Sequence, residues 1–197
     1  MIIGITGKLG SGKSTAAEHL VQQHCYTEYS FASPLKQIGE IFGFSYDQLY
    51  GTQENKLEIH PYWGISSREF LQKVGTELFR DLLPKVIPDM KIEYSVWVDL
   101  FKMCYRREPK LYVISDVRFL DEARAIKSLG GVIIKTERTN NIVSQSGSEM
   151  KHKSEMELMQ IIPDYVINND YLTILEAKQQ LDCIVRREFA RLEMLKL

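Results

Sequence analysis

The 197-residue chain has no long hydrophobic run, few cysteines and almost no net charge. No apolar stretch approaches the roughly 18 residues of a membrane-spanning helix, and residues 1–6 are too short for the apolar core of a signal peptide. Its three cysteines form no Cys-x-x-Cys pair and cannot all pair with one another, which favours a reducing compartment. A net charge of −1 creates no global field that would recruit nucleic acid or an anionic membrane. We therefore expect a soluble, cytoplasmic protein that binds neither nucleic acid nor membrane.

What the chain does have is enough apolar sequence, 44% of its residues, for a sizeable core. Short apolar runs separated by segments of helical periodicity are typical of a doubly wound α/β fold, in which helices cover both faces of a parallel sheet. Helices are expected from Thr15 to His24, from Leu120 to Leu129 with Gly130 as a C-terminal cap, and from Thr173 onwards. The five runs that predict buried parallel strands are 2–6, 28–32, 111–115, 132–136 and 165–168.

The clearest motif is a complete Gly-x-x-x-x-Gly-Lys-Ser phosphate-binding loop at Gly7–Ser14, placed between the first strand and the first helix. Glycines allow consecutive backbone N–H groups to point at an anion, and the positive end of the following helix adds to the same site. Lys13 is expected to reach the β- and γ-phosphates of a nucleoside triphosphate, and the Ser14 hydroxyl to ligate Mg²⁺. The motif predicts binding of a nucleoside triphosphate.

About eighty residues separate the second and third strands, too many for a simple crossover, and segment 34–110 therefore predicts a helical insertion. One helix should begin at the capping pattern Ser66–Glu69 and run to about Leu83, and another should span 95–107, whereas 50–56 is polar and loop-like. Within the first of these helices, one face is expected to be buried and the opposite face to be polar. The expected buried face is Phe70, Val74, Leu78 and Leu82, and the polar face is Arg68, Gln72, Thr76 and Arg80.

Segment 139–160 has the composition of a mobile lid. Residues 139–150 are rich in Asn, Ser and Gly without an apolar period, and Lys151, His152 and Lys153 follow. A segment tipped with cations at the carboxyl end of a strand can close over a phosphate site. An ordinary surface loop is the alternative interpretation.

Three further charged residues should emerge at the carboxyl edge of the sheet. Asp116 directly follows the third strand and can hold Mg²⁺ next to Ser14, although an N-cap role is the alternative. Arg118 and Arg138 follow the third and fourth strands, and the guanidinium group suits phosphate because it donates two parallel hydrogen bonds. Isolated arginines are commonly plain surface charges. Together with Arg68 and Arg80, however, they could surround two phosphate groups.

Six motifs in this chain resemble the deoxynucleoside monophosphate kinase family of bacteriophages, and the resemblance covers most of the sequence. Beside the phosphate-binding loop, they are Phe31-Ala32-Ser33-Pro34-Leu35-Lys36, Arg68-x-x-x-Gln72-x-x-Gly75-Thr76-Glu77, Ser115-Asp116-Val117-Arg118-Phe119-x-x-Glu122, His152-x-Ser154-Glu155 and Asp164-Tyr165-Val166-Ile167-Asn168-Asn169-Asp170.

The resemblance implies an adenylate-kinase-like core of five parallel strands, a monophosphate-binding insertion and a lid: core 1–33, 111–138 and 161–197, insertion 34–110, lid 139–160. It implies that Arg118 and Arg138, with Lys13 and Asp116, act on the transferred phosphate, and that Ser14 and Asp116 hold the metal. The residues implied for ATP are Gly7, Gly10, Ser11, Gly12, Lys13, Ser14, Thr15, Asn168 and Asp170. Those implied for the acceptor are Lys36, Arg68, Gln72, Thr76, Arg80 and His152.

The expected reaction is transfer of the γ-phosphate of ATP, with Mg²⁺, to a deoxynucleoside monophosphate. Phosphomevalonate and dephospho-coenzyme A kinases have similar cores and stay open as alternatives within the same reaction class. A nucleotide-dependent switch is a different class, but Asn168-Asn169-Asp170 lacks the lysine of a guanine-reading Asn-Lys-x-Asp motif. A nucleic-acid-dependent ATPase is disfavoured by the near-zero net charge. The sequence leaves open whether two copies pair as a homodimer.

Overall fold

A computed structural model describes residues 1–139 and 153–194 of the chain. The chain divides into two compact units, Met1–Tyr29 with Pro109–Leu197, and Ser30–Glu108. The predicted core segments fall mainly in the first unit and the predicted insertion falls mainly in the second. Residues 140–152 of the predicted lid lie outside the described residues.

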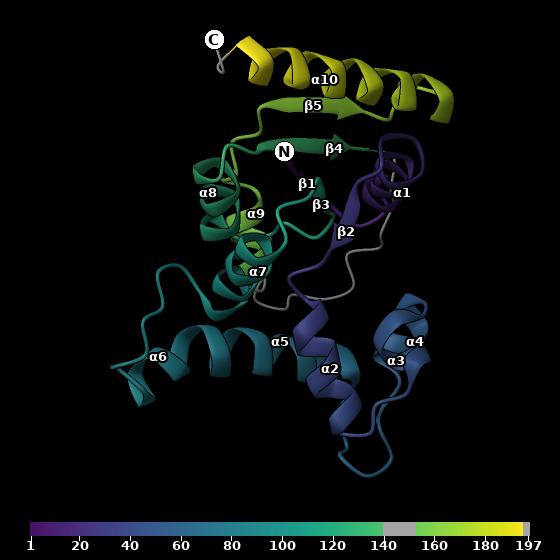
Figure 1. The fold of residues 1–197 in the computed structure, drawn as a ribbon. Helices are drawn as coiled ribbons and strands as arrows, with labels where there is room; N and C mark the ends of the chain where they lie inside the picture. The colour runs from purple at the N-terminus through teal and green to yellow at the C-terminus, as the bar shows by residue number, and fades with distance from the viewer. Residues whose placement is uncertain (140–152, 195–197) are drawn as a thin grey trace. The chain divides into compact units, whose positions relative to one another are not determined.

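The first unit is built on a parallel sheet with the strand order β2-β3-β1-β4-β5 (Figure 1). The central strand β1 pairs with β3 through Ile2 and Tyr112, and with β4 through Ile3 and Val132. These five parallel strands among the described residues confirm the predicted sheet. The strands are β1 (Ile2–Thr6), β2 (Thr27–Tyr29), β3 (Tyr112–Ile114), β4 (Val132–Glu137) and β5 (Tyr165–Asn168).

Helices cover both faces of this sheet, as predicted. Helices α1 (Lys13–His24) and α10 (Ile174–Met194) pack on one face, where their apolar side chains join those of β1 in one buried cluster. Helix α8 (Leu120–Ser128) packs against β1 and β4 on the other face. The contact with β1 is tight, because a Cβ atom at Gly4 would lie 2.7 Å from the Ile126 side chain. The short helix α9 (Lys153–Leu158) lies beside α8, where Glu157 accepts a hydrogen bond from the Leu120 N–H group.

Most element boundaries in the first unit agree with the sequence prediction, but β2 does not. It was expected at 28–32 and spans only Thr27–Tyr29, because its partner β3 offers just the three residues Tyr112–Ile114 for pairing. Helix α1 begins two residues earlier than expected, at Lys13. Gly130 follows Leu129, the C-cap residue of α8, and has a φ angle of 76°, the left-handed conformation typical of this position.

The second unit is helical, which confirms the nature of the predicted insertion. Phe44, Leu49 and Phe70 form its buried cluster, and the Trp97 indole N–H donates to the Gly75 carbonyl oxygen at 3.0 Å. Helix α7 begins after Ser95 as predicted. The helices are α2 (Ser33–Ile41), α3 (Tyr46–Tyr50), α4 (Gln53–Leu57), α5 (Ser67–Gln72), the π-helix η1 (Lys73–Leu82), α6 (Leu83–Val86) and α7 (Val96–Arg107).

The prediction that residues 50–56 are a loop is wrong, because most of them belong to the two short helices α3 and α4. Each helix begins with a capping box, in which a hydroxyl and an amide side chain satisfy backbone groups at the first turn. Ser45 pairs in this way with Gln48, and Thr52 with Asn55. Polar composition was therefore a sign of helix ends rather than of irregular chain.

The predicted faces of the helix that follows Ser66 are only partly correct. Its start is confirmed, because the Ser66 hydroxyl accepts a hydrogen bond from the Glu69 N–H group. Phe70 is buried, but Leu78 and Leu82 each keep 45% of their surface exposed. From Lys73 onwards the turns widen into a π-helix with i→i+5 bonds, so residues four apart no longer share one face.

Among the described residues, none of the helices combines the length and the apolarity that a membrane crossing requires. The three cysteines all lie within the described residues and form no disulfide with one another.

Candidate active site

The phosphate-binding loop in the first unit takes its shape from glycines with positive φ angles. Gly7, Gly10 and Gly12 have φ angles of 145°, 73° and 102°. At Gly7 a larger residue is excluded twice, since a Cβ atom would also lie 2.3 Å from the Thr136 carbonyl oxygen. The Ser11 N–H group donates to the Lys8 carbonyl oxygen at 3.2 Å, which closes the turn. The motif thus forms the curled loop that the sequence predicted.

Helix α1 starts at the end of this loop without a side-chain cap. Gly12 occupies the N-cap position, and no acidic residue lies in the first turn. Ser14 and Thr15 are exposed there. The first N–H groups of a helix need partners and carry partial positive charge, so an uncapped start next to a glycine loop is a site for an anion.

The Lys13 side chain folds back over the loop. Its ammonium group donates to the carbonyl oxygens of Gly7 at 2.8 Å and Lys8 at 2.7 Å. Burial and then the positive charge of Arg118 lower the pKa of Lys13 to about 8, while the carboxylate of Asp116 acts in the opposite direction. The three charged groups that the sequence placed at one edge of the sheet therefore influence one another.

Asp116 follows β3 by two residues, next to the end of β1. The pairing of Gly4 with Ile114 and the hydrogen bond from Val117 N–H to the Ile5 carbonyl oxygen (3.2 Å) bring the two strand ends together. Asp116 is half-buried. A carboxylate and a hydroxyl such as that of Ser14 are hard oxygen donors, which Mg²⁺ prefers, so the donor set fits the predicted metal.

The backbone around Arg118 is held by a buried carboxylate. Glu122, 3% exposed, accepts hydrogen bonds from the N–H groups of Arg118 at 2.7 Å and Phe119 at 3.0 Å. This fixes the turn while the Arg118 side chain stays exposed. Arg138 is also exposed, directly after β4. Glu122 belongs to the motif Ser115–Glu122, but this role was not predicted from the sequence.

Two side chains support the phosphate-binding loop from behind, in a role that was not predicted from the sequence. The Thr136 hydroxyl lies 2.8 Å from the fully buried Ser11 hydroxyl, and the Asn169 amide donates to the Ser11 carbonyl oxygen at 2.7 Å. The Asn169 amide nitrogen also lies 2.6 Å from where a Cβ atom at Gly12 would be. The position of Asn169 between Asn168 and Asp170, at a strand end, was the signal that could have identified it.

Asn168 and Asp170, which were predicted to border ATP, form hydrogen bonds with the chain near the ends of β4 and β5. The Asn168 amide oxygen accepts from the Asp170 N–H group at 3.0 Å. The Asp170 carboxylate accepts from both the N–H group and the hydroxyl of Thr139. These bonds join the ends of β4 and β5 beside the loop, and a role of either residue in ATP binding stays a prediction.

All but one of the residues predicted for the acceptor lie in the second unit, the exception being His152. An Arg68 guanidinium nitrogen lies 3.4 Å from the Gln53 side-chain oxygen, and the Lys36 ammonium lies 4.4 Å from the centre of the Tyr50 ring. Thr76 is 7% exposed, whereas Gln72 and Arg80 are half-buried. His152 lies outside the described residues. The acceptor role of this set stays a prediction.

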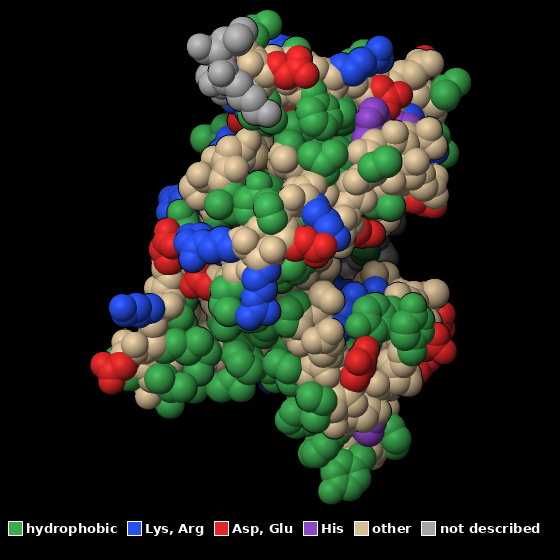
Figure 2. Space-filling view, in the orientation of Figure 1, with side chains coloured by type: hydrophobic (Ala, Val, Ile, Leu, Met, Phe, Trp, Pro, Cys, Tyr) green, Lys and Arg blue, Asp and Glu red, His purple; other side chains and the backbone are tan. Residues whose placement is uncertain are grey.

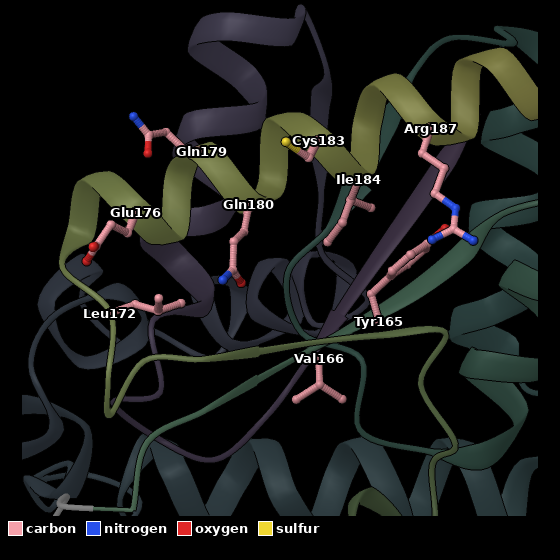
Figure 3. A pocket seen from close by; sticks show the side chains of 9 residues that line it. All are labelled: Tyr165, Val166, Leu172, Glu176, Gln179, Gln180, Cys183, Ile184 and Arg187. Carbon is pink, nitrogen blue, oxygen red and sulfur yellow. The ribbon is translucent and has the colours of Figure 1, made fainter.

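The hollow of about 570 Å³ between β5 and α10 is a different feature (Figure 3). Its lining includes the Tyr165 ring, with the Arg187 guanidinium carbon 5.9 Å from the ring centre, and the exposed Cys183. None of its lining residues belongs to Gly7–Thr15, and neither Asp116 nor Arg118 contributes to it. The hollow therefore contains none of the residues that were predicted for ATP or for the metal.

A comparison with known sequences identifies a relative of this chain. A protein of Acanthamoeba polyphaga mimivirus, assigned by inference as a deoxynucleotide monophosphate kinase, is 41% identical over 168 residues. The match covers 82% of this chain and 83% of that protein. No family model matches the chain.

Solved structures with a similar arrangement are also kinases. They include APS kinase of Mycobacterium tuberculosis (Cys556Ala mutant; TM-score 0.43, 11% identity), shikimate kinase of Bacteroides thetaiotaomicron (0.42, 14%) and dephospho-CoA kinase of Campylobacter jejuni (0.44, 14%). Each match covers 94% of this chain, and 96%, 98% and 95% of the respective neighbours. At these identities and TM-scores, no conclusion about function is drawn from the similarity.

Proposed function

Because this chain belongs to the deoxynucleotide monophosphate kinase family, we propose that it transfers the γ-phosphate of ATP to a deoxynucleoside monophosphate and forms two diphosphates. The observation that carries the proposal is the cluster of Lys13, Asp116 and Arg118 beside the uncapped start of α1. Phosphoryl transfer depends on positioning and on neutralising charge, and this edge of the sheet supplies both.

Binding of ATP is attributed to the loop and to the start of α1. Backbone N–H groups of Gly10, Gly12 and the first helical residues would surround the β- and γ-phosphates. The Lys13 ammonium, now bonded to the Gly7 and Lys8 carbonyl oxygens, would turn towards the phosphates when they arrive. Since phosphate competes with two neutral carbonyl groups for a cation, the exchange is favourable.

We assign Mg²⁺ to the Ser14 hydroxyl and the Asp116 carboxylate. Bound there, the ion would offset negative charge on the transferred phosphate. Arg118 and Arg138 add mobile cations at the same sheet edge, one after β3 and one after β4. Their exposure leaves them able to move as charge develops.

We assign acceptor binding to the helical second unit. Arg68 and Arg80 offer cations for the phosphate of the monophosphate, and Lys36 and Gln72 add polar contacts for its sugar or base. The exposed Arg68 is the strongest member of this set, since its 3.4 Å contact with the Gln53 side-chain oxygen is long and easily exchanged for a phosphate. An acceptor bound there would also have to keep out water, which would otherwise accept the phosphate.

We also propose that the enzyme is of the bacteriophage type and that it is located in the cytoplasm. Cysteines that form no disulfide support a reducing compartment. The proposed partners are small nucleotides alone, with pairing of two copies left open.

The test is a panel of acceptors assayed with ATP and Mg²⁺. Each deoxynucleoside monophosphate, dephospho-coenzyme A and phosphomevalonate is offered in turn, and the phosphorylated product is separated and identified. We expect at least one deoxynucleoside diphosphate and no product from the other two acceptors. ATP hydrolysis without any diphosphate of a deoxynucleoside, or turnover of another acceptor alone, would contradict the proposal.

A further inference from the structure

Two histidines of α1 and one aspartate of α10 converge at a point away from the candidate active site. The Nε2 atoms of His19 and His24 lie 2.7 Å and 2.6 Å from the same carboxylate oxygen, Oδ1 of Asp182. The two imidazole rings are 5.8 Å apart and meet edge to face. Figure 2 shows histidine side chains (purple) reaching the surface between α1 and α10. All three residues belong to the first unit.

The three side chains are arranged as a donor set. Their ligand atoms all lie within 4.8 Å of one another. His19 is 8% exposed, whereas His24 and Asp182 keep 21% and 31% of their side-chain surface, so the cluster is anchored on one side and open on the other. The nearby Arg186 donates to the Asp182 backbone carbonyl oxygen at 3.3 Å, not to its carboxylate.

We propose that His19, His24 and Asp182 bind a divalent transition-metal ion of the zinc class, with water as a further ligand. Two imidazoles and one carboxylate with an open position suit Zn²⁺ or Co²⁺, while Mg²⁺ prefers oxygen donors alone. The site is therefore separate in both place and chemistry from the magnesium site assigned to Ser14 and Asp116.

Binding requires a small rearrangement that the exposed side of the cluster permits. The present separations are hydrogen-bond lengths, and a carboxylate oxygen accepts such a bond only from a nitrogen that carries a proton. In a tetrahedral site with bonds of about 2.0 Å, neighbouring ligand atoms lie about 3.3 Å apart. Each Nε2–Oδ1 pair must therefore spread by roughly 0.6 Å, and an Nε2 that donates to Asp182 must lose its proton to Nδ1 or to solvent before it can ligate. His24 is the last residue of α1, where the helix ends at Cys25, and can adjust most easily.

The bound ion would fasten α1 to α10. Helix α1 begins at the phosphate-binding loop, and Asn169, shortly before α10, donates to the same loop. A metal link between the two helices therefore stabilises the framework behind the loop without touching the nucleotide. This role does not depend on which acceptor the kinase uses.

The experiment uses the full chain after treatment with a chelator, without nucleotide. Co²⁺ is titrated while its visible absorption is followed, Zn²⁺ binding is measured by calorimetry, and thermal unfolding is recorded with and without Zn²⁺. We expect one ion per chain, a spectrum of low-symmetry four- or five-coordinate Co²⁺ without a thiolate band, and a higher melting temperature with Zn²⁺. No saturable binding, or a thiolate band that disappears in Cys25→Ser or Cys183→Ser, would overturn the proposal.

Two variants distinguish a metal site from a hydrogen-bonded cluster. Asp182→Asn keeps an oxygen that accepts from both imidazoles but removes the charged ligand, and His24→Gln removes one imidazole at a partly exposed position. Each should weaken Co²⁺ binding at least tenfold and abolish the Zn²⁺-dependent rise in melting temperature. His60→Gln, which changes a histidine of the second unit, should leave both unchanged. Wild-type metal affinity in Asp182→Asn and His24→Gln would contradict the assignment.

Discussion

The loop that we assign to ATP and the helix that we assign to the acceptor use different means to hold a phosphate. At the loop, backbone N–H groups are expected to form most of the contacts with phosphate. They are arranged by the positive φ angles of Gly7, Gly10 and Gly12 and by the uncapped start of α1. In the second unit, side chains such as Arg68 project from a helix that changes from α to π at Lys73. The first arrangement is set by a short local motif, whereas the second depends on the geometry of a whole helix.

Removing the lysine of the loop should give the largest effect. Lys13→Met takes away the cation directed at the transferred phosphate, and we expect turnover to fall by about 10³-fold. The loop is shaped by its backbone, so circular dichroism and thermal unfolding should stay as in the wild type. Lys110→Met is the matched control outside the loop. Turnover within roughly threefold of wild type in Lys13→Met would show that the loop does not act as proposed.

Removing an arginine of the second unit should affect only the other substrate. Arg68→Ala deletes a charge-assisted hydrogen bond worth about 1.5–3 kcal/mol, so the KM for the monophosphate should rise by roughly 10- to 100-fold. The KM for ATP should not change. Arg107→Ala, an exposed arginine of the same unit, is the control. A rise in the KM for ATP alone would assign the second unit to the wrong nucleotide.

Removing a side chain behind the loop should have a smaller effect, and this effect should be on the KM for ATP rather than on the KM for the monophosphate. Asn169→Ala removes the hydrogen bond to the Ser11 carbonyl oxygen, which helps to hold the loop in place. We expect the KM for ATP to rise about tenfold, with the KM for the monophosphate unchanged. Steady-state kinetics with each substrate varied in turn measures both. Equal changes in the two values would mean that Asn169 supports the fold rather than the loop.

The smallest expected effect is the uptake of protons by Lys13 when ATP binds. The pKa of Lys13 is lowered to about 8 in the nucleotide-free protein, so about half of the molecules carry a neutral Lys13 near pH 8. Bound phosphate favours the ammonium, and ATP binding should therefore take up about half a proton at that pH and almost none near pH 6. Affinity should correspondingly fall as the pH rises above 8.

Calorimetry in buffers of different ionisation enthalpy measures this uptake. Lys13→Met supplies the baseline, because protons taken up by ATP itself remain in that variant. Equal uptake in the variant and the wild type at pH 8 would show that Lys13 does not titrate on binding.

The same contrast explains what could be predicted from the sequence. Parallel strands, their helices and the phosphate-binding loop follow local rules, and the predicted β1 and β5 match the structure residue for residue. The exposure of Leu78 and Leu82 could not be predicted. Apolar residues spaced four apart indicate a buried helix face only if the helix stays α-helical, and the sequence pattern does not show where α-helical turns change to π-helical ones. The hydrogen bond from the Asn169 amide to the Ser11 carbonyl oxygen joins residues that are 158 apart in the sequence, and only the fold brings them together.

The account depends most on the claim that one chain holds ATP and a monophosphate at the same time. A bisubstrate ligand, in which adenosine and a deoxynucleoside are joined by five phosphates, measures this directly by calorimetry. We predict one molecule bound per chain, at least tenfold more tightly than ATP, with the advantage lost in both Lys13→Met and Arg68→Ala. Binding no tighter than that of ATP, for every base tested, would contradict the account.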